Sequence, residues 1–204
     1  MRDDTGANAG AVTPAFVPSP APRVIVARNG TVLEVQPLAA ARIAALQRFN
    51  AGLSERTRSV FLPHAYDDET VRRYAARSEQ AQDRAYLLYR GSEVVGYFFL
   101  WEFNKPVPIL GLGLADAWQG QGLGEPMLRL LMSDARTAGR DAIELTTVPT
   151  NERALRLYHR VGFEEVGETD NIAGDGRIAR ERRMFLALKP GARPRERSFK
   201  PPAP

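Results

Sequence analysis

The chain has 204 residues, of which 44% are hydrophobic and 25% charged, as in an ordinary soluble globular protein. It has no cysteine and two histidines, which excludes disulfides, thiol nucleophiles and cysteine-ligated metals, and we expect no metal site. The net charge of +4 could indicate nucleic-acid binding, but residues 189–204 alone carry five basic side chains and one acidic one. The remainder is close to neutral, so we expect no nucleic-acid partner.

Both ends of the chain differ in composition from its middle. Residues 1–22 and 189–204 hold nine of the fifteen prolines and few large apolar side chains. This predicts an Ala/Pro-rich disordered tail before the domain and a basic, Pro-rich disordered tail after it. Residues 23–188 suit one compact domain. No apolar run is long enough to span a membrane, and acidic residues stand where a signal peptide carries positive charge. We therefore expect a cytoplasmic protein with no membrane partner.

The N-terminal half of the domain combines helix and strand patterns. Apolar residues recur at helical spacing after Ala39, and Asp67 or Asp68 can cap a later helix. Two strand-like runs separated by a four-residue turn predict an antiparallel hairpin, whereas the stretch 53–66 has no clear period. In chain order we expect a strand over 31–35, helices over about 39–49 and 67–78, and strands over 85–89 and 94–102.

The C-terminal half begins with a strand over 108–115 that Gly111 and Gly113 interrupt. Glycines in a strand mark either a close approach of a ligand or backbone, or a crowded corner of the sheet. The order of elements along the domain predicts an α+β fold around one mixed sheet. After the first strand we expect a helix over 125–138, a strand over 142–148, a helix over 152–161, and strands over 163–167 and 178–188.

The turn at 119–124, between a strand and a helix, is rich in glycine. N–H groups at a helix start have no partner within the helix, and glycines let the backbone come close to phosphate oxygens, so this turn can bind an anion. A P-loop is excluded because no lysine occurs between Lys105 and Lys189. A dinucleotide fingerprint is excluded because Glu125 and Met127 stand where its last glycine belongs.

Two sequence blocks lie in register around this turn. The first is Gln-x-x-Gly-x-Gly at 119–124, and the second is an Asn a turn ahead of Ala-x-x-Leu-Tyr-x-x-x-Gly-Phe, at 151–163. Both blocks and their spacing resemble the signature of the GCN5-related N-acetyltransferases, the GNAT superfamily. The motif-bearing part covers about residues 108–168, and the order of elements extends the likeness to 31–188. The resemblance implies a GNAT-like fold, with a mostly antiparallel sheet of about seven strands flanked by about four helices.

The resemblance also implies acetyl-CoA as co-substrate and assigns its site. In the family, the pantetheine arm pairs with the fourth strand, which would explain Gly111 and Gly113, and the pyrophosphate lies on the glycine turn. A tyrosine near the sulfur protonates the leaving thiolate, which makes Tyr158 the catalytic acid. On spacing alone, Tyr158 could instead be a packing residue and Asn151 a helix cap. The implied cofactor-binding residues are Leu112, Gly113, Leu114, Gln119, Gly120, Gln121, Gly122, Leu123, Gly124, Asn151 and Tyr158.

The general base stays open. Many family members place a glutamate on the fourth strand, but residues 109–114 contain no carboxylate. The candidates elsewhere are Glu102, Glu144 and His64. Histidine has the most suitable intrinsic pKa, although an isolated histidine can equally be a surface or packing residue.

By this resemblance, we expect an N-acetyltransferase that moves an acetyl group from acetyl-CoA to a primary amine of a small molecule, by direct attack on the thioester. Two alternatives stay open. One is a protein acetyltransferase acting on a lysine or an N-terminal amine, and the other is a non-catalytic module that binds an acyl-CoA. The expected partner is a small-molecule amine acceptor, and a homodimer is left open.

Overall fold

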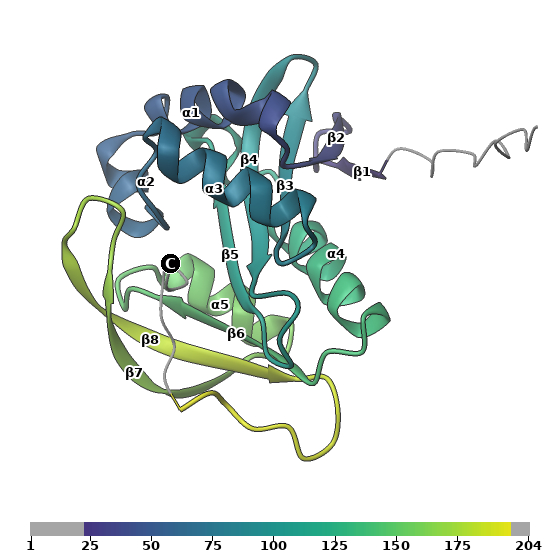
Figure 1. Cartoon of the computed structure of the whole chain (residues 1–204), viewed down its shortest axis with the longest axis vertical. Helices are drawn as coiled ribbons and strands as arrows, with labels where there is room; N and C mark the ends of the chain where they lie inside the picture. Colours follow the sequence, from purple (N-terminus) through teal and green to yellow (C-terminus); the bar gives the residue numbers. More distant parts are fainter. Residues whose placement is uncertain (1–22, 197–204) are drawn as a thin grey trace, which may run out of the picture.

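The structure is a computed structural model that describes residues 23–196. Its centre is one eight-stranded sheet in the spatial order β1-β2-β3-β4-β5-β6-β8-β7 (Figure 1). All neighbouring strands are antiparallel except β5 and β6, which are parallel. The strands are β1 (Arg23–Val26), β2 (Val32–Pro37), β3 (Arg84–Arg90), β4 (Glu93–Trp101), β5 (Ile109–Leu114), β6 (Ala142–Thr147), β7 (Glu164–Ile172) and β8 (Ile178–Ala187).

Helices cover both faces of the sheet, and each face has its own apolar core. Alternation along β4 shows this directly, because Tyr97, Phe99 and Trp101 pack with α1 and α3, whereas Phe98 and Leu100 pack with α4 and α5 (Figure 1). None of the helices in residues 23–196 has the length and hydropathy needed to cross a bilayer. The helices are α1 (Ile43–Ala51), α2 (Glu55–Val60), α3 (Asp68–Glu79), α4 (Gly124–Thr137) and α5 (Glu152–Arg160), with short 3-10 turns η1 (Ala40–Arg42) and η2 (Asp116–Trp118).

Short polar side chains start two of these helices. Asp67 accepts a hydrogen bond from the backbone N–H of Thr70 at the start of α3, which confirms the cap expected there. Ser54 accepts one from Thr57 at the start of α2 in the same way. These caps fix where α2 and α3 begin and therefore the course of the loop between them.

The sequence-based fold class is confirmed, with one more strand and one more helix than expected. The additional strand is β1, a four-residue edge strand whose Val24 and Val26 are exposed. The additional helix is α2, which lies in the stretch 53–66 where no period was visible and is six residues long. Elements this short carry too few residues for their pattern to separate from a loop.

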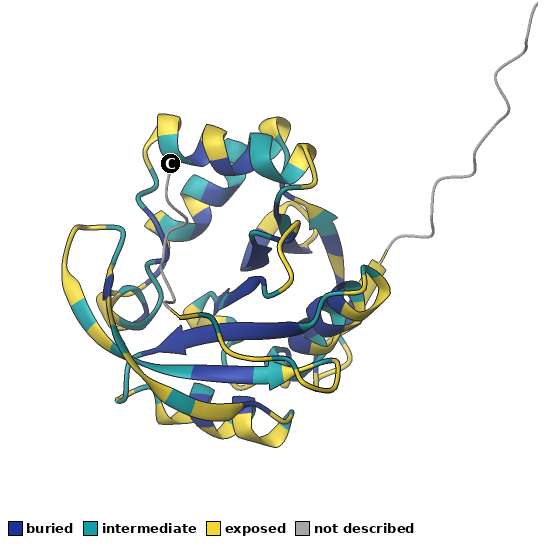
Figure 2. Cartoon of the chain, turned by 60° about the horizontal axis from the view of Figure 1, so that its bottom comes forward, coloured by how far each residue is buried: buried dark blue, intermediate teal, exposed yellow. Residues whose placement is uncertain are grey.

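The parallel pair at the centre of the sheet is short. β5 and β6 pair only at Ile109–Glu144 and Leu110–Leu145, and beyond these positions their C-terminal ends separate. β6 continues to pair with β8, and β7, at the edge of the sheet, has mostly exposed residues (Figure 2). The separation leaves an opening in the middle of the sheet.

Part of the expected C-terminal tail lies in contact with the domain. Lys189 Nζ lies 2.7 Å from Asp141 Oδ1, and the Arg195 guanidinium forms an ion pair with Glu102. Residues 189–196 therefore pack on the sheet end, in contrast to the free tail expected from composition. The expected tail at 1–22 and the rest of the C-terminal one, 197–204, lie outside the described residues.

Candidate active site

A cleft of about 620 Å³ occupies the opening between β5 and β6. Its walls come from α2 and the loop after it, from the start of α4, from α5, and from the tip of the β7–β8 hairpin. Among the residues implied by the sequence blocks, the cleft is lined by Leu112, Gly113, Leu114, Gln119, Gly120, Gly122, Leu123, Gly124, Asn151 and Tyr158. Gln121 does not line the cleft. Its backbone carbonyl accepts a hydrogen bond from the N–H of Arg28.

The glycine turn at one end of the cleft has the conformation that only glycine adopts easily. Gly120 and Gly122 have φ angles of 85° and 79°, in the left-handed region. α4 begins directly after this turn, and no side chain caps its first N–H groups. These uncapped donors, together with the helix dipole, create a site suited to an anion such as a phosphate.

Two arginines that sequence reasoning missed flank this turn. An Arg153 guanidinium nitrogen lies 3.4 Å from where a Cβ of Gly120 would stand, and the Arg28 side chain lies 3.7 Å from the equivalent point at Gly122. Both residues line the cleft, and neither has an ion pair within residues 23–196. Their positive charge adds to that of the helix start.

Asp116 holds the glycine turn against α2. Its carboxylate accepts hydrogen bonds from the Ser54 hydroxyl at 2.5 Å and the Thr57 hydroxyl at 2.7 Å, and the Gln119 amide donates to Thr57 in turn. The hydrogen bonds from Ser54, followed by that from Thr57, lower the pKa of Asp116 to about 2. Asp116 is thus a structural bracket between two walls of the cleft.

The glycines of β5 serve packing. A Cβ at Gly111 would overlap the Phe99 ring, and one at Gly113 would overlap the Phe61 ring. This crowding by Phe99 and Phe61 fits the crowded-corner alternative and accounts for both glycines without a ligand. Phe61 packs edge-on against Tyr97, at 6.3 Å between ring centroids, and so closes the wall above Gly113.

Asn151 stands at the N-cap position directly before α5, and its side chain does not cap the helix. Its side chain makes no hydrogen bond to the helix N–H groups, and its Nδ2 lies 3.3 Å from Thr147 Oγ1 instead. The capping interpretation of Asn151 is therefore wrong for the side chain. Its amide faces the cleft from the end of β6.

Comparison with known proteins identifies this arrangement. The family model described as Acetyltransferase (GNAT) family matches residues 51–163, more than half of the chain. The chain belongs to the GNAT acetyltransferase family. This confirms the family assignment made from the two sequence blocks.

Several curated relatives and solved structures resemble this chain. It is 31% identical over 77 residues to a mycothiol acetyltransferase from Corynebacterium glutamicum, covering 37% of this chain and 26% of that one. It is 36% identical over 81 residues to the N-alpha-acetyltransferase RimI of Mycobacterium tuberculosis, covering 38% and 49%. The chain thus matches half or less of the length of these relatives. The GNAT domain of S. lividans PAT has the same fold, with a TM-score of 0.70 at 17% identity over 83% of this chain and 99% of that one.

Tyr158 lies in the wall of the cleft, as the family motif implies. It is 6% exposed, and its ring packs on Phe163 at 5.9 Å between centroids. Burial raises the pKa of Tyr158, and the negative charge of Glu181 raises it further. The phenol therefore keeps its proton at neutral pH and can act as a donor.

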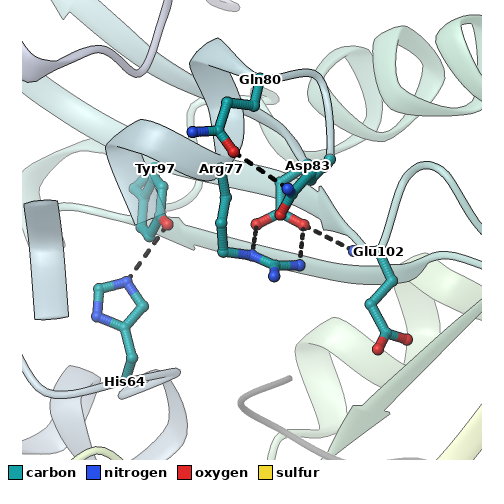
Figure 3. Close-up of polar contacts among 7 residues, drawn as sticks. His64, Arg77, Gln80, Asp83, Tyr97 and Glu102 are labelled. Carbon is teal, nitrogen blue, oxygen red and sulfur yellow. Dashed lines mark hydrogen bonds and ion pairs between the residues drawn. The ribbon is translucent and has the colours of Figure 1, made fainter. Parts of the chain in front are cut away.

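His64 does not line the cleft. Its ring is 1% exposed and stacks on Tyr74 at 4.4 Å, with Nε2 3.3 Å from the Tyr97 hydroxyl (Figure 3). Burial is the main cause that lowers the pKa of His64 to about 4. The packing interpretation of this histidine fits the structure, and the interpretation as a general base does not.

The two carboxylate candidates for the base are also placed outside the cleft lining. Glu102 forms an ion pair with Arg195, and its backbone N–H donates to Asp83, which is itself held by Arg77 (Figure 3). Glu144 is fully buried and forms an ion pair with Arg183. Both carboxylates are committed to structural ion pairs, which argues against either of them as the base.

A third group of polar residues, which sequence reasoning missed, lies at the end of the cleft remote from the glycine turn. Asn171 on β7 donates through Nδ2 to Thr146 Oγ1 at 2.9 Å and to Glu181 Oε2 at 2.7 Å. All three residues line the cleft. In the sequence, Glu181 is hidden among the alternating charges of the last hairpin, and no local signal separates it from them.

The tip of the β7–β8 hairpin closes one side of this remote end. The Gly174 N–H donates to the Leu62 carbonyl at 2.9 Å, and a Cβ at Gly174 would overlap the backbone of His64. The hairpin tip therefore touches the loop between α2 and α3 directly, as the nearness of the two in Figure 1 indicates. The contact forms a bridge over the cleft.

Proposed function

We propose that this protein is an acetyl-CoA-dependent N-acetyltransferase that acts on a primary amine of a small molecule. The observation that carries this proposal is the cleft itself, which joins an anion site at one end to a bridged, partly apolar chamber at the other. Tyr158 lines the same cleft.

The residues at the glycine turn fit coenzyme A. Its pyrophosphate would be held by the uncapped N–H groups at the start of α4, with Arg28 and Arg153 beside them. The backbone edge of β5 at 112–114 is not paired with β6 and lines the cleft, where it would pair with the pantetheine amides. When bound, acetyl-CoA supplies the activated acetyl thioester.

Tyr158 would serve as the general acid of the transfer. A buried phenol that keeps its proton can donate it to a departing thiolate, whose ordinary pKa is about 8.5. The packing of the Tyr158 ring on Phe163 restricts the position of its hydroxyl. Proton donation then depends on how close that hydroxyl lies to the sulfur of the bound thioester. This role requires no metal and no second cofactor.

The bridge between Gly174 and Leu62 supports a small acceptor. A peptide substrate needs a groove open at both sides, and this contact closes one of them. Phe61, Ile172 and Ile178 add apolar lining at this end, which suits the carbon skeleton of a compact amine. The second candidate acceptor is the N-terminal amine of a protein, favoured by the 36% identity to an N-alpha-acetyltransferase.

The test is release of free thiol from acetyl-CoA across a panel of primary amines. The panel contains aliphatic polyamines, amino sugars, amino acids, and peptides with either a free N-terminus or a free lysine. Turnover with the small amines is the expected result. Turnover with the peptides alone would favour the second candidate, and binding of acetyl-CoA without any turnover would favour the non-catalytic module.

A further inference from the structure

One of the two arginines at the glycine turn comes from the N-terminal edge of the sheet. Arg28 lies in the turn between β1 and β2, and its side chain lies 3.7 Å from the point where a Cβ of Gly122 would stand. It lines the cleft and has no ion pair within residues 23–196. A guanidinium at this point can contact a phosphate only while the turn that carries it is held in place.

The strand that leads to Arg28 has little support from the sheet. β1 is a four-residue edge strand, and among the described strands it pairs with β2 alone (Figure 1). A two-stranded hairpin is marginally stable by itself. The position of the turn therefore depends on contacts that the hairpin makes outside the sheet. These contacts are with α4 and with the glycine turn before it.

The first contact anchors the beginning of β1 to the last turn of α4. Arg23 Nη1 donates to both carboxylate oxygens of Asp134, at 2.9 and 3.1 Å, and to the Tyr86 hydroxyl at 3.0 Å. The Tyr86 hydroxyl donates in turn to Asp134 at 2.6 Å. Burial, followed by this hydrogen bond, raises the pKa of Tyr86, so the phenol keeps its proton at neutral pH. The Asp134 side chain is 11% exposed, which limits the screening of its ion pair.

The second contact holds the hairpin turn against the glycine turn. The Arg28 N–H donates to the Gln121 carbonyl at 2.8 Å. Within the hairpin turn, the Ala27 N–H donates to the Thr31 carbonyl at 2.9 Å, and Asn29 Oδ1 accepts from the Thr31 N–H at 3.0 Å. The backbone of Arg28 is thus fixed both within the hairpin and to the cofactor end of the cleft.

The spacing of the two contacts matches the length of α4. The segment from Arg23 to Arg28 spans about 17 Å as an extended chain. A helix rises by about 17 Å between Leu123, directly before α4, and Asp134. Between the contacts, Ile25 belongs to the same apolar core as the buried face of α4. Because the two ends of this segment contact the two ends of the helix, an anchor at Arg23 restrains the turn that carries Arg28.

We propose that the β1–β2 hairpin is a clamp for the phosphates of acetyl-CoA, in which Arg28 contacts the phosphates and the ion pair of Arg23 with Asp134 positions Arg28. This inference rests on the proposed function, which requires acetyl-CoA at the glycine turn, and it gives the N-terminal hairpin a part in that function. Arg28 binds the cofactor, whereas Arg23 and Asp134 are positioning residues. Holding a charged side chain in its bound position before the ligand arrives increases affinity, because less ordering is left to the binding step.

The charge of Arg23 is too far from the phosphates to act on them directly. It lies about 17 Å from Arg28 along the extended chain. At physiological ionic strength, charges are screened over about 8 Å. An effect of Arg23 on cofactor affinity must therefore pass through the position of the hairpin, and a double-mutant cycle with Arg28 measures that coupling.

The test measures the Kd for acetyl-CoA by calorimetry in the full-length chain at physiological ionic strength. The variants are Arg23→Ala, Arg28→Ala and the two combined. Arg23→Ala leaves the hydrogen bond between Tyr86 and Asp134 in place, so it removes the anchor of β1 without opening the surface of α4. The matched control is Arg72→Ala, which removes another exposed, ion-paired arginine that does not line the cleft. The control ligand is acetylpantetheine, which has the thioester but neither the pyrophosphate nor the nucleotide.

We expect Arg28→Ala to raise the Kd for acetyl-CoA about tenfold, because one charge-assisted contact is lost. Arg23→Ala should raise it about fourfold, since the apparent Kd rises as the fraction of chains with Arg28 in place falls. In the Arg28→Ala background, Arg23→Ala should have no further effect. Arg23→Lys, which can still pair with Asp134, should recover most of the affinity. Arg72→Ala should match the wild type, and the Kd of acetylpantetheine should be the same in every variant.

Several outcomes would overturn the inference. Equal effects of Arg23→Ala with and without Arg28 would show that Arg23 does not act through it. A Kd of Arg28→Ala within about twofold of the wild type would remove the phosphate contact. Equal losses for acetyl-CoA and acetylpantetheine would show a general loss of structure in place of a clamp. If Arg23→Ala unfolds, Asp134→Asn takes its place in the cycle.

Failure of the proposed function gives a different result. If the wild-type protein binds acetyl-CoA but acetylates no amine, the proposed function fails, and the cycle of Kd values still decides the clamp. If turnover is normal and the two substitutions are additive, the clamp alone fails. If the wild-type protein does not bind acetyl-CoA, both fail.

Discussion

Acid should destabilise this protein through His64. The ring is buried among aromatic side chains, and desolvation holds its pKa at about 4, against 6.5 in an exposed histidine. The positive charge of Arg73 lowers the pKa further, while the hydrogen bond with the Ala65 carbonyl opposes the shift. The unfolded chain therefore takes up this proton at a higher pH than the folded protein does.

The magnitude follows from this difference. Stability from the neutral ring is fully present above pH 6.5 and is lost progressively as the pH falls toward 4, because the unfolded state binds the proton there and the folded state does not. At 1.36 kcal/mol for each pH unit, the difference between 6.5 and about 4 amounts to roughly 3 kcal/mol. This is a large fraction of the stability of a typical domain.

The assay is urea unfolding at several pH values between 7 and 4.5. His64→Gln should flatten the dependence of the unfolding free energy on pH, whatever its effect at pH 7. The matched control is His159→Gln, the same substitution at the other histidine, which is exposed on α5. Parallel pH dependences in the wild type and His64→Gln would refute the reasoning. Because His64 does not line the cleft, its removal should also leave the pH dependence of kcat/KM near 6.5 unchanged.

Three further predictions concern the cleft. Tyr158→Phe should lower kcat by about 10²–10⁴-fold and leave acetyl-CoA affinity and packing nearly unchanged; a loss under fivefold, with chemistry rate-limiting, would end its role as the acid. Arg153→Ala should raise the Kd for acetyl-CoA about tenfold and weaken its dependence on salt, as calorimetry at two ionic strengths would show, because a charge-assisted contact at an exposed site is partly screened. Gly174→Ala should raise the acceptor KM severalfold at constant acetyl-CoA affinity, since its Cβ would push the hairpin tip off His64. Gly176→Asn, in the same turn but facing open space, should not, and equal effects of the two would contradict the bridge.

The anion end of the cleft could be predicted because its chemistry is local in sequence. Gly120 and Gly122 have left-handed backbone, and α4 starts two residues after Gly122, so one short segment contains both the special conformation and the unpaired donors. The same holds for Tyr158, which a few residues of helix fix against Phe163. A short motif specifies the geometry of its own segment, and the structure has the left-handed glycines and the uncapped helix start that this motif predicts.

The partners of that end could not be predicted, because they come from distant segments. Arg28 reaches the turn only because β1 and β2 form a hairpin whose backbone donates to Gln121. The glycines of β5 were ambiguous for a similar reason. The group that packs against Gly113 is the ring of Phe61, which follows directly after α2. The sequence of α2 has no periodic pattern, so this contact could not be predicted.

The polar group at the end of the cleft remote from the glycine turn depends on strand register, which is why it escaped the sequence. Asn171 pairs with Ala179 across the β7–β8 hairpin, so Glu181 lies diagonally beside it on the same face. A change of one residue in the length of the turn at 173–177 would move Glu181 to the opposite face and bring an arginine into the cleft. The alternation of charges along β8 is the same in both registers. Only the contact of Gly174 with Leu62 and the pairing of the whole hairpin decide which sign of charge faces the cleft.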